Sequence, residues 1–264
     1  MIYLQPQTVT EALEAYASET LAGRKALWYS GGTEILSFLR KGTLKADTLI
    51  DLKILPAYTA LETREDGWHI GGGVPLNRLL ETEVPEVLKA CVRPIADRTV
   101  RNRLTLAGNL CGRLPYREAV LPLWALEAEV TLAGPEGLTR KPLRDQFTRN
   151  MALPAGSFLL EVRVPGNAPR RAWGAVRKVR LGAVDYPVVH VLITGEPGDY
   201  TLCVSGLCPF PFRLEGLAAD DLARPETLPL PAAPQEDRMA TAAYRLHLFT
   251  LATHEALIQA GGAR

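Results

Sequence analysis

Residues 100–110 combine residue types that could bind an anion. They read Val-Arg-Asn-Arg-Leu-Thr-Leu-Ala-Gly-Asn-Leu and have no simple helix or strand period, so we expect a loop. Gly108 lets the backbone turn or approach a bound group closely, and Asn109 tolerates left-handed geometry. The Thr105 hydroxyl adds to backbone N–H groups that could face a phosphate. The alternative interpretation of this stretch alone is a tight turn beside a basic surface.

A second stretch with the same potential begins with a predicted buried strand at residues 26–29. A Ser-Gly-Gly turn at residues 30–32 follows, and residues 33–42 predict a helix that ends on glycine. A strand, a glycine turn and a helix start direct unpaired N–H groups and a positive dipole end at one place. The alternative is a helix that Thr33 simply caps. The stretch is neither a G-x-G-x-x-G fingerprint nor a P-loop.

The two stretches together carry a resemblance that neither carries alone. Tyr-Ser-Gly-Gly-Thr-Glu-Ile-Leu at residues 29–36 is similar to A-G-G-T-D-L-L, and residues 100–110 are similar to V-R-N-R-G-T-I-G-G-N-L. These are the two flavin loops of the FAD-binding medium subunits of molybdenum hydroxylases, the xanthine dehydrogenase and carbon monoxide dehydrogenase family. The resemblance continues at residues 49–52, 70–73, 123–130 and 237–245, so it covers nearly the whole chain.

The resemblance implies an α+β fold. It predicts a two-subdomain FAD-binding domain of the p-cresol methylhydroxylase and vanillyl-alcohol oxidase type, followed by a C-terminal three-stranded sheet with helices. We expect the FAD-binding domain at residues 1–165, with subdomains at about 1–52 and 53–165, and a C-terminal flavoprotein domain at residues 166–264.

Hydrophobic periodicity and turn residues predict the individual elements. We expect helices at residues 8–21, 33–42, 75–81, 85–96, 116–125 and 236–260. We expect strands at residues 26–29, 48–52, 58–64, 68–70, 129–133, 157–165, 173–180, 188–194 and 200–205. The last three strands would form the C-terminal sheet, and a proline-rich connector at 224–234 would lead to the final helix.

In the family, the first loop wraps the FAD pyrophosphate mainly through backbone N–H groups. The resemblance therefore implies cofactor contacts for Trp28, Tyr29, Ser30, Gly31, Gly32, Thr33, Glu34 and Ile35. It implies further contacts from the second loop, at Thr105, Leu106, Ala107, Gly108 and Asn109. This chain departs from the family at two places in the second loop. Leu104 and Ala107 both stand where the family usually has glycine, and a Cβ at either place could narrow the approach to the cofactor.

Three positions outside the loops also match the family. Glu118 stands where relatives carry an Asp that touches the flavin nucleotide, and a helix N-terminal carboxylate favoured by the dipole is the alternative interpretation. Leu159 matches a position whose backbone meets the pyrimidine edge of the isoalloxazine, although its side chain is core. Lys178 matches a lysine close to the flavin ring, where a cation would favour the anionic reduced flavin. The arginine that ends the family's K-x-x-x-R motif is absent after Lys178.

Composition and charge indicate which classes of partner we do not expect and in which compartment we expect the protein. The 264-residue chain is 47% apolar, and its net charge of +1 gives no global field for nucleic acid or an anionic membrane. No apolar run approaches the ~20 residues of a membrane span, and the N-terminus does not resemble a signal peptide, so we expect a cytoplasmic protein. The four cysteines and four histidines predict no disulfide framework, metal site or extra iron–sulfur cluster.

We therefore expect an oxidoreductase subunit without catalytic residues of its own. It would bind FAD non-covalently, because neither loop contains His or Cys to bond the flavin. The resemblance implies a large molybdenum-binding subunit and a small [2Fe–2S] subunit as partners, in a dimer of heterotrimers. Electrons from the clusters would reach the FAD and then an external acceptor, for which NAD, quinone and oxygen are all open.

Two other functions are compatible with the sequence. One is a stand-alone FAD-dependent oxidoreductase of the same fold, although such an enzyme would need a substrate pocket of its own. The other is a scaffold subunit that has lost FAD, which the departures at Leu104 and Ala107 and the missing arginine would suggest.

Overall fold

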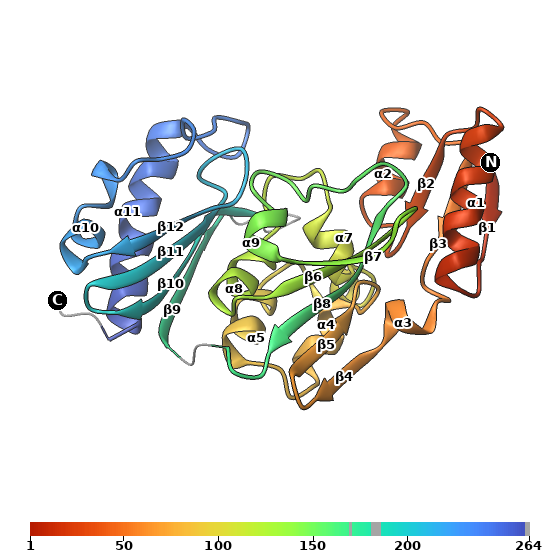
Figure 1. Ribbon diagram of the computed structural model, residues 1–264. Coiled ribbons are helices and arrows are strands. Elements are labelled where there is room, and N and C mark those ends of the chain that lie inside the picture. The colour runs from red at the N-terminus through yellow and green to blue at the C-terminus, as the bar shows by residue number, and fades with distance from the viewer. Residues whose placement is uncertain (169–170, 181–185, 262–264) are drawn as a thin grey trace.

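The computed structural model describes residues 1–168, 171–180 and 186–261 of the chain. Within these residues three sheets follow one another along the molecule, as Figure 1 shows. The N-terminal sheet, drawn in red, lies at one end and the C-terminal sheet, drawn in blue, at the other. The largest sheet lies between them, so both outer sheets can contribute residues to clefts against the middle part.

The N-terminal sheet is parallel, with the strand order β1-β3-β2. Its strands are β1 (Ile2–Leu4), β2 (Ala26–Tyr29) and β3 (Thr48–Asp51), and its helices are α1 (Val9–Leu21) and α2 (Ile35–Arg40). The short strand β1 is not predicted from the sequence, because three largely exposed residues carry no readable pattern. β3 is buried along its whole length, as expected for the central strand of a parallel sheet.

The middle sheet is antiparallel, with the order β4-β5-β8-β6-β7. Its strands are β4 (Leu61–Arg64), β5 (Gly67–Gly71), β6 (Glu129–Gly134), β7 (Gly137–Pro142) and β8 (Phe158–Pro165). The helices around it are α3 (Pro56–Thr59), α4 (Leu76–Leu80), α5 (Glu86–Val92), α6 (Arg98–Arg101), α7 (Leu106–Leu110), α8 (Val120–Ala125) and α9 (Leu143–Gln146). The sequence predicts the β4–β5 hairpin, but residues 58 and 59 end α3 rather than starting a strand.

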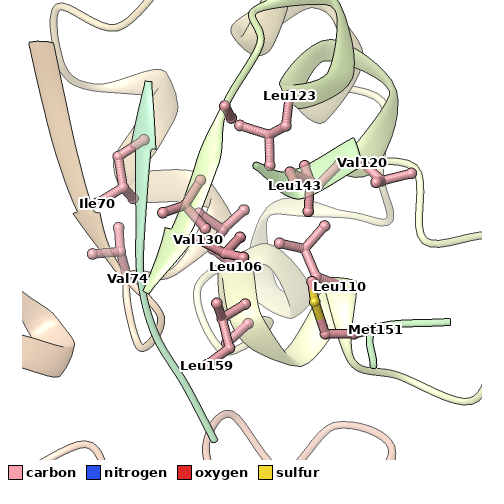
Figure 2. Packing of buried hydrophobic residues seen from close by; sticks show 14 of the residues in the cluster. Ile70, Val74, Leu106, Leu110, Val120, Leu123, Val130, Leu143, Met151 and Leu159 are labelled. Atoms are coloured by element: carbon pink, nitrogen blue, oxygen red, sulfur yellow. The ribbon is translucent and has the colours of Figure 1, made fainter. Parts of the chain in front are cut away.

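Residues 100–110 are not simply the loop that the sequence predicts. They contain the end of α6 and the whole of α7, each a single turn or slightly more, which are too short to show a helical period. Figure 2 shows the two leucines of α7, Leu106 and Leu110, in the packed core near Val130 and Leu159. Both leucines are fully buried, since positions four apart lie on one face of a helix. The core thereby anchors this stretch.

The C-terminal sheet is antiparallel and has four strands rather than the predicted three, in the order β12-β11-β10-β9. These are β9 (Ala172–Val179), β10 (Pro187–Glu196), β11 (Asp199–Ser205) and β12 (Phe212–Leu217). The sequence does not predict β12, because prolines precede it and Gly216 interrupts it. Helix α11 (Ala242–Gln259) packs on β9 and β10 (Figure 1), and α10 (Ala219–Ala223) with a 3-10 turn (Pro225–Thr227) connects sheet and helix.

Helix α11 begins six residues later than the sequence predicts, at Ala242 instead of residue 236. Asp237 explains the difference, because its carboxylate accepts from the N–H of Met239 at 2.8 Å and from the guanidinium of Arg245 at 2.8 Å. Arg245 is fully buried and also donates to the carbonyl oxygens of Val188 and Gly206. The segment before the helix is therefore fixed by side-chain hydrogen bonds. No helix in the described part of the chain is long and apolar enough to cross a membrane.

Candidate functional site

The first loop, defined as residues 28–35, presents a run of free backbone donors. No hydrogen bond among the described residues takes up the N–H groups of residues 31–35. Several of the carbonyls are engaged, and two of these bonds lead into α2: Gly32 O accepts from Leu36 N at 3.1 Å and Glu34 O from Phe38 N at 3.0 Å. The C=O of one residue and the N–H of the next point in opposite directions across a trans peptide. These bonds therefore turn the free N–H groups away from the body of α2.

In the second loop, defined as residues 100–110, the N–H groups of residues 106–109 are all occupied within the protein. Leu106 N donates to Val74 O at 2.9 Å, and Ala107 N donates to Gly72 O at 2.8 Å. Gly108 N donates to the Thr105 hydroxyl at 3.2 Å, because Thr105 is the N-cap of α7. The N–H of residue 109 donates to the Thr105 carbonyl at 2.9 Å. The N–H groups of residues 106–109 are therefore not free to bind a ligand.

The two loops pack against each other. The hydroxyl oxygens of Ser30 and Thr105 lie 2.7 Å apart and share a hydrogen bond. A Cβ added at Gly31 would lie 1.8 Å from the carbonyl oxygen of Arg103, so only glycine permits this approach. Gly32 has a φ of +70°, a left-handed conformation that side chains rarely adopt. The second loop thus forms the seat on which the first loop rests.

Two cavities meet at the first loop. The smaller one, of about 270 Å³, is mainly apolar and lies between the N-terminal sheet and the middle part. The larger one, of about 840 Å³, lies between the loops and the start of the C-terminal sheet. Residues lining both cavities are Gly31, Gly32, Thr33, Glu34, Leu104, Gly108 and Gly112. An elongated ligand could therefore occupy both cavities while its middle lies against the free N–H groups.

Aromatic side chains build the wall of the smaller cavity. Trp28 stacks on Tyr16 with ring centroids 4.7 Å apart and also contacts Phe158 at 4.8 Å. Trp28, Phe158 and the buried Tyr58 all line the cavity. Ile35 and Leu159 complete the predicted residues at this place. A flat, largely apolar group would fit this wall, because aromatic faces favour stacking.

The two departures from the family motif are accommodated by the packing. Ala107 lines the smaller cavity, and a Cβ added at the neighbouring Gly72 would lie 2.9 Å from the Ala107 methyl group. Glycine at position 72 thus leaves the space that the extra methyl group occupies. Leu104 lines both cavities, while its backbone N–H and C=O bond to Val100 and Leu76, each at 2.8 Å. Neither residue distorts the loop.

Glu34 introduces a carboxylate next to the free N–H groups. Its Oε1 accepts from the backbone N–H of Arg113 at 2.8 Å. Burial raises the pKa of Glu34 above its ordinary value, although the Arg113 hydrogen bond and the charges of Arg113 and Arg117 act in the opposite direction. The net effect is a raised pKa, so Glu34 loses its proton at a higher pH than an exposed glutamate does.

Glu118 does not act as a simple helix N-terminal carboxylate. It is buried and lines the larger cavity, and its carboxylate bonds Arg177 Nε at 2.7 Å and His190 Nδ1 at 2.8 Å. Burial alone would raise the pKa of Glu118, but His190 and the charge of Arg177 outweigh burial and lower it. Glu118 therefore joins the middle part to strands β9 and β10 as an ionised group.

Three predicted residues lie outside both cavities. Lys178 points toward α11, where its Nζ pairs with both carboxylate oxygens of Glu255 at 2.7 Å. Its neighbour Arg177 lines the larger cavity instead, because adjacent strand residues face opposite sides. Tyr29 packs under Lys53, whose Nζ lies 4.0 Å from the ring centroid. Leu106 is a core residue.

Sequence reasoning missed several residues that line the cavities. Tyr58 was assigned to a strand, and Phe158 precedes the predicted Leu159 without a motif of its own. Arg117 is 4% exposed, lines the larger cavity and has a φ of +34°. The only indication of Arg117 in the sequence is its position directly before Glu118, which matches a family position. Among the described residues, no group of three or more His, Cys, Asp or Glu side chains is arranged to hold a metal ion.

Comparisons with known proteins identify the family of this chain. Residues 1–167 match the model of the family described as "FAD binding domain in molybdopterin dehydrogenase". The carbon monoxide dehydrogenase medium chain of Hydrogenophaga pseudoflava is 24% identical over 225 residues, covering 81% of this chain and 77% of that protein. The glyceraldehyde dehydrogenase medium chain of Sulfolobus acidocaldarius is 24% identical over 196 residues, covering 70% and 69%.

Solved structures confirm the predicted α+β architecture. Carbon monoxide dehydrogenase from Hydrogenophaga pseudoflava superposes with a TM-score of 0.84 at 22% identity, covering 99% of this chain and 97% of that chain. Quinoline 2-oxidoreductase from Pseudomonas putida 86 superposes with a TM-score of 0.82 at 20% identity, covering 98% and 96%. The named relatives are chains of oxidoreductases. This chain belongs to the family of FAD-binding domains of molybdopterin dehydrogenases.

Proposed function

We propose that this chain is the FAD-binding electron-transfer subunit of a molybdenum hydroxylase complex. The observation that supports this most directly is the run of free N–H groups at residues 31–35, located where two cavities meet. Backbone donors beside a helix start suit a pyrophosphate, which needs small residues and no particular side chain. The close packing of Gly31 on the Arg103 carbonyl keeps the first loop in this arrangement. The family to which the chain belongs is one of FAD-binding domains, which also supports the proposal.

The residues present fit the parts of FAD. The aromatic wall of Trp28, Tyr58 and Phe158 suits the adenine, while the free N–H groups would hold the pyrophosphate. The larger cavity has room for the isoalloxazine and is lined by Arg117, Arg177 and other charged side chains. When bound, the flavin would supply electron transfer in one-electron or two-electron steps. The chain's own residues would bind it, orient it and exclude water.

The predicted contacts divide into three groups on this proposal. Residues 31–35 would donate backbone hydrogen bonds, and Trp28 would pack against the adenine end. Leu159 lines this smaller cavity too, so it would contact the adenine end and not the isoalloxazine edge that the resemblance implies. Glu118 would form part of the wall of the flavin cavity, with Arg177 replacing Lys178 as the cation at that wall. We also propose the domain division of residues 1–165 and 166–264, because each part is organised around sheets of its own.

FAD would be bound non-covalently. Cys111 is the thiol nearest to the loops in sequence, and it lines the smaller cavity. Burial raises the pKa of the Cys111 thiol to about 12, which keeps it protonated and unreactive at neutral pH. Acid or detergent should therefore release all of the flavin.

The partners proposed are a large molybdenum-binding subunit and a small [2Fe–2S] subunit, in a dimer of heterotrimers in the cytoplasm. The named relatives are medium chains, which supports an assembly with other subunits. Electrons would pass from the clusters of the small subunit to the FAD and on to NAD, a quinone or oxygen. No nucleic acid or membrane span is part of this proposal.

An anaerobic stopped-flow assay of flavin bleaching tests the proposal. We expect the purified chain to contain FAD in about equimolar amount and to be reduced by artificial donors. It should not be reduced by purines, aldehydes or carbon monoxide until the partner subunits are added. Direct bleaching of the lone chain by such a substrate would favour a stand-alone flavoenzyme. A colourless protein that cannot be reconstituted with FAD would favour a scaffold subunit.

A further inference from the structure

Lys53 lies behind the first loop and contacts it in two ways. Its Nζ donates to the carbonyl oxygen of Ser30 at 3.1 Å. The same ammonium lies 4.0 Å from the centroid of the Tyr29 ring, a cation–π distance. Lys53 lines neither of the two cavities that meet at the loop. It is therefore placed to act on the loop and not on a ligand directly.

A buried carboxylate holds Lys53 in this position. Asp51, at the end of β3, is 3% exposed, and its Oδ1 accepts from Lys53 Nζ at 2.6 Å and from Lys53 N at 3.0 Å. The other oxygen of Asp51 accepts a hydrogen bond from the Tyr3 hydroxyl of β1. Burial, reinforced by Asp51, raises the pKa of Tyr3 to about 12, so Tyr3 stays a donor at neutral pH. The ion pair with the buried Asp51 thus places the partly exposed Lys53 beside the Ser30 carbonyl.

The bond to Ser30 determines where the next N–H group points. The Ser30 carbonyl and the Gly31 N–H belong to one planar trans peptide, so they point in opposite directions. A donor that holds the carbonyl on the Lys53 side turns the Gly31 N–H toward the opposite side. Gly31 lines both cavities there, and its N–H has no partner among the described residues. The positive charge also polarises this peptide, which strengthens its N–H as a donor.

We propose that Lys53 is a positioning residue for pyrophosphate binding, acting through the Ser30–Gly31 peptide of the first loop. The lysine, held by Asp51, fixes the orientation of that peptide and increases the partial positive charge on its N–H. This inference rests on the proposed FAD-binding function. It differs from a general charge effect, because it requires the hydrogen bond to Ser30.

The test compares ligands with and without phosphates in equilibrium dialysis against the full-length apo-protein. The variants are Lys53→Met, Lys53→Arg, and Lys45→Met as a matched control, because Lys45 is an exposed lysine of the same part of the chain. Lys53→Met should weaken ADP binding about tenfold, because a charge-assisted contribution to the donor is lost. Adenosine, which lacks phosphates, should bind Lys53→Met and the wild type equally.

Lys53→Arg keeps the charge and a donor, so it should restore most of the ADP affinity. Lys45→Met should leave both affinities unchanged. An equal loss for adenosine and ADP in Lys53→Met would overturn the inference, since it would show a general collapse of the site. So would unchanged ADP binding in Lys53→Met, or an equal loss in Lys45→Met. A wild-type chain that binds neither ADP nor FAD would instead overturn the proposed function itself, which keeps the two failures distinct.

Discussion

The two flavin-type loops are similar in composition but do different work. The first loop leaves the N–H groups of residues 31–35 free, whereas those of residues 106–109 are used inside the protein. The second loop is also anchored by Leu106 and Leu110, which are fully buried in the core. A loop that is anchored in the core and bonds most of its own N–H groups can support another loop. A ligand-binding motif can therefore consist of two parts: a presenting loop, here the first loop, which offers free N–H groups, and a seat, here the second loop, which supports it.

Gly31→Ala should have the largest effect, because it breaks the contact between presenter and seat. The added Cβ would lie 1.8 Å from the backbone oxygen of Arg103, which cannot move without shifting the second loop. We expect the free energy of unfolding to fall by about 1–3 kcal/mol, a typical cost of overpacking. FAD affinity should fall by more than about a hundredfold, since displaced donors lose the phosphate. Flavin content and urea unfolding measure the two effects.

Gly32→Val should rank second and affect the cofactor more than the fold. A Cβ there meets the Tyr29 side chain, which can move more easily than backbone, but the φ of +70° disfavours a β-branched residue. We expect FAD binding to weaken by at least about tenfold, because the distorted loop misplaces its donors. Gly42→Val is the matched control, with a φ of +68° and open space around it. Full flavin occupancy in Gly32→Val would mean that the first loop is only a helix cap.

Thr105→Ala tests the seat alone. It removes the cap to Gly108 N and the hydrogen bond to the Ser30 hydroxyl. The unfolding free energy should fall by about 1 kcal/mol, as for other lost N-caps, and FAD affinity by only about threefold. Thr105→Ser keeps the hydroxyl and should behave like the wild type. If Thr105→Ala lost FAD without any loss of stability, the hydroxyl would be a direct ligand and the division of tasks would be wrong.

Glu34→Gln should give the smallest effect, confined to the presenting loop. Burial raises the pKa of Glu34, so its stabilising contribution is fully present below about pH 4.3, the ordinary glutamate value. That contribution is lost as pH rises through the raised pKa, because the folded protein must then bury a carboxylate. The free energy of unfolding of the wild type should therefore fall relative to that of Glu34→Gln as the pH rises from about 4 to about 7. Thermal unfolding midpoints across this range check it; parallel curves would contradict the prediction.

Short-range patterns in the sequence predict much of the fold. The strand Ala26–Tyr29 and the hairpin of Leu61–Arg64 with Gly67–Gly71 follow from local propensities, and the structure has them. Strand β12 could not be predicted, because its partner β11 and not its own sequence makes it a strand. The sequence predicts Thr105 as a cofactor contact, but its role as the N-cap of α7 is visible only in the structure.

The choice between Arg177 and Lys178 shows why the remainder of the site could not be predicted. Both residues are basic neighbours on β9, and sequence matching selects Lys178. Which one faces the cavity depends on the register of β9 against β10, which shifts between Pro187 and Val189. The register depends on how both strands pair and pack against the core, so the sequence of β9 alone does not determine it. Likewise, the N–H groups of residues 31–35 are free because no neighbouring segment among the described residues places an acceptor next to them, which the sequence of the loop alone does not show.

The hydrophobic core does not stop where the family match stops. The match ends at residue 167, but Leu192 of β10 and Cys203 of β11 are fully buried in the same cluster as the middle part. Arg177 and His190, which bond the Glu118 carboxylate, also lie beyond that limit. A fragment cut at residue 167 would expose apolar surface and remove both of these partners of Glu118. The segment that the family model matches, residues 1–167, is therefore smaller than the unit that shares one hydrophobic core. A chimera that exchanges this segment between relatives should also carry strands β10 and β11.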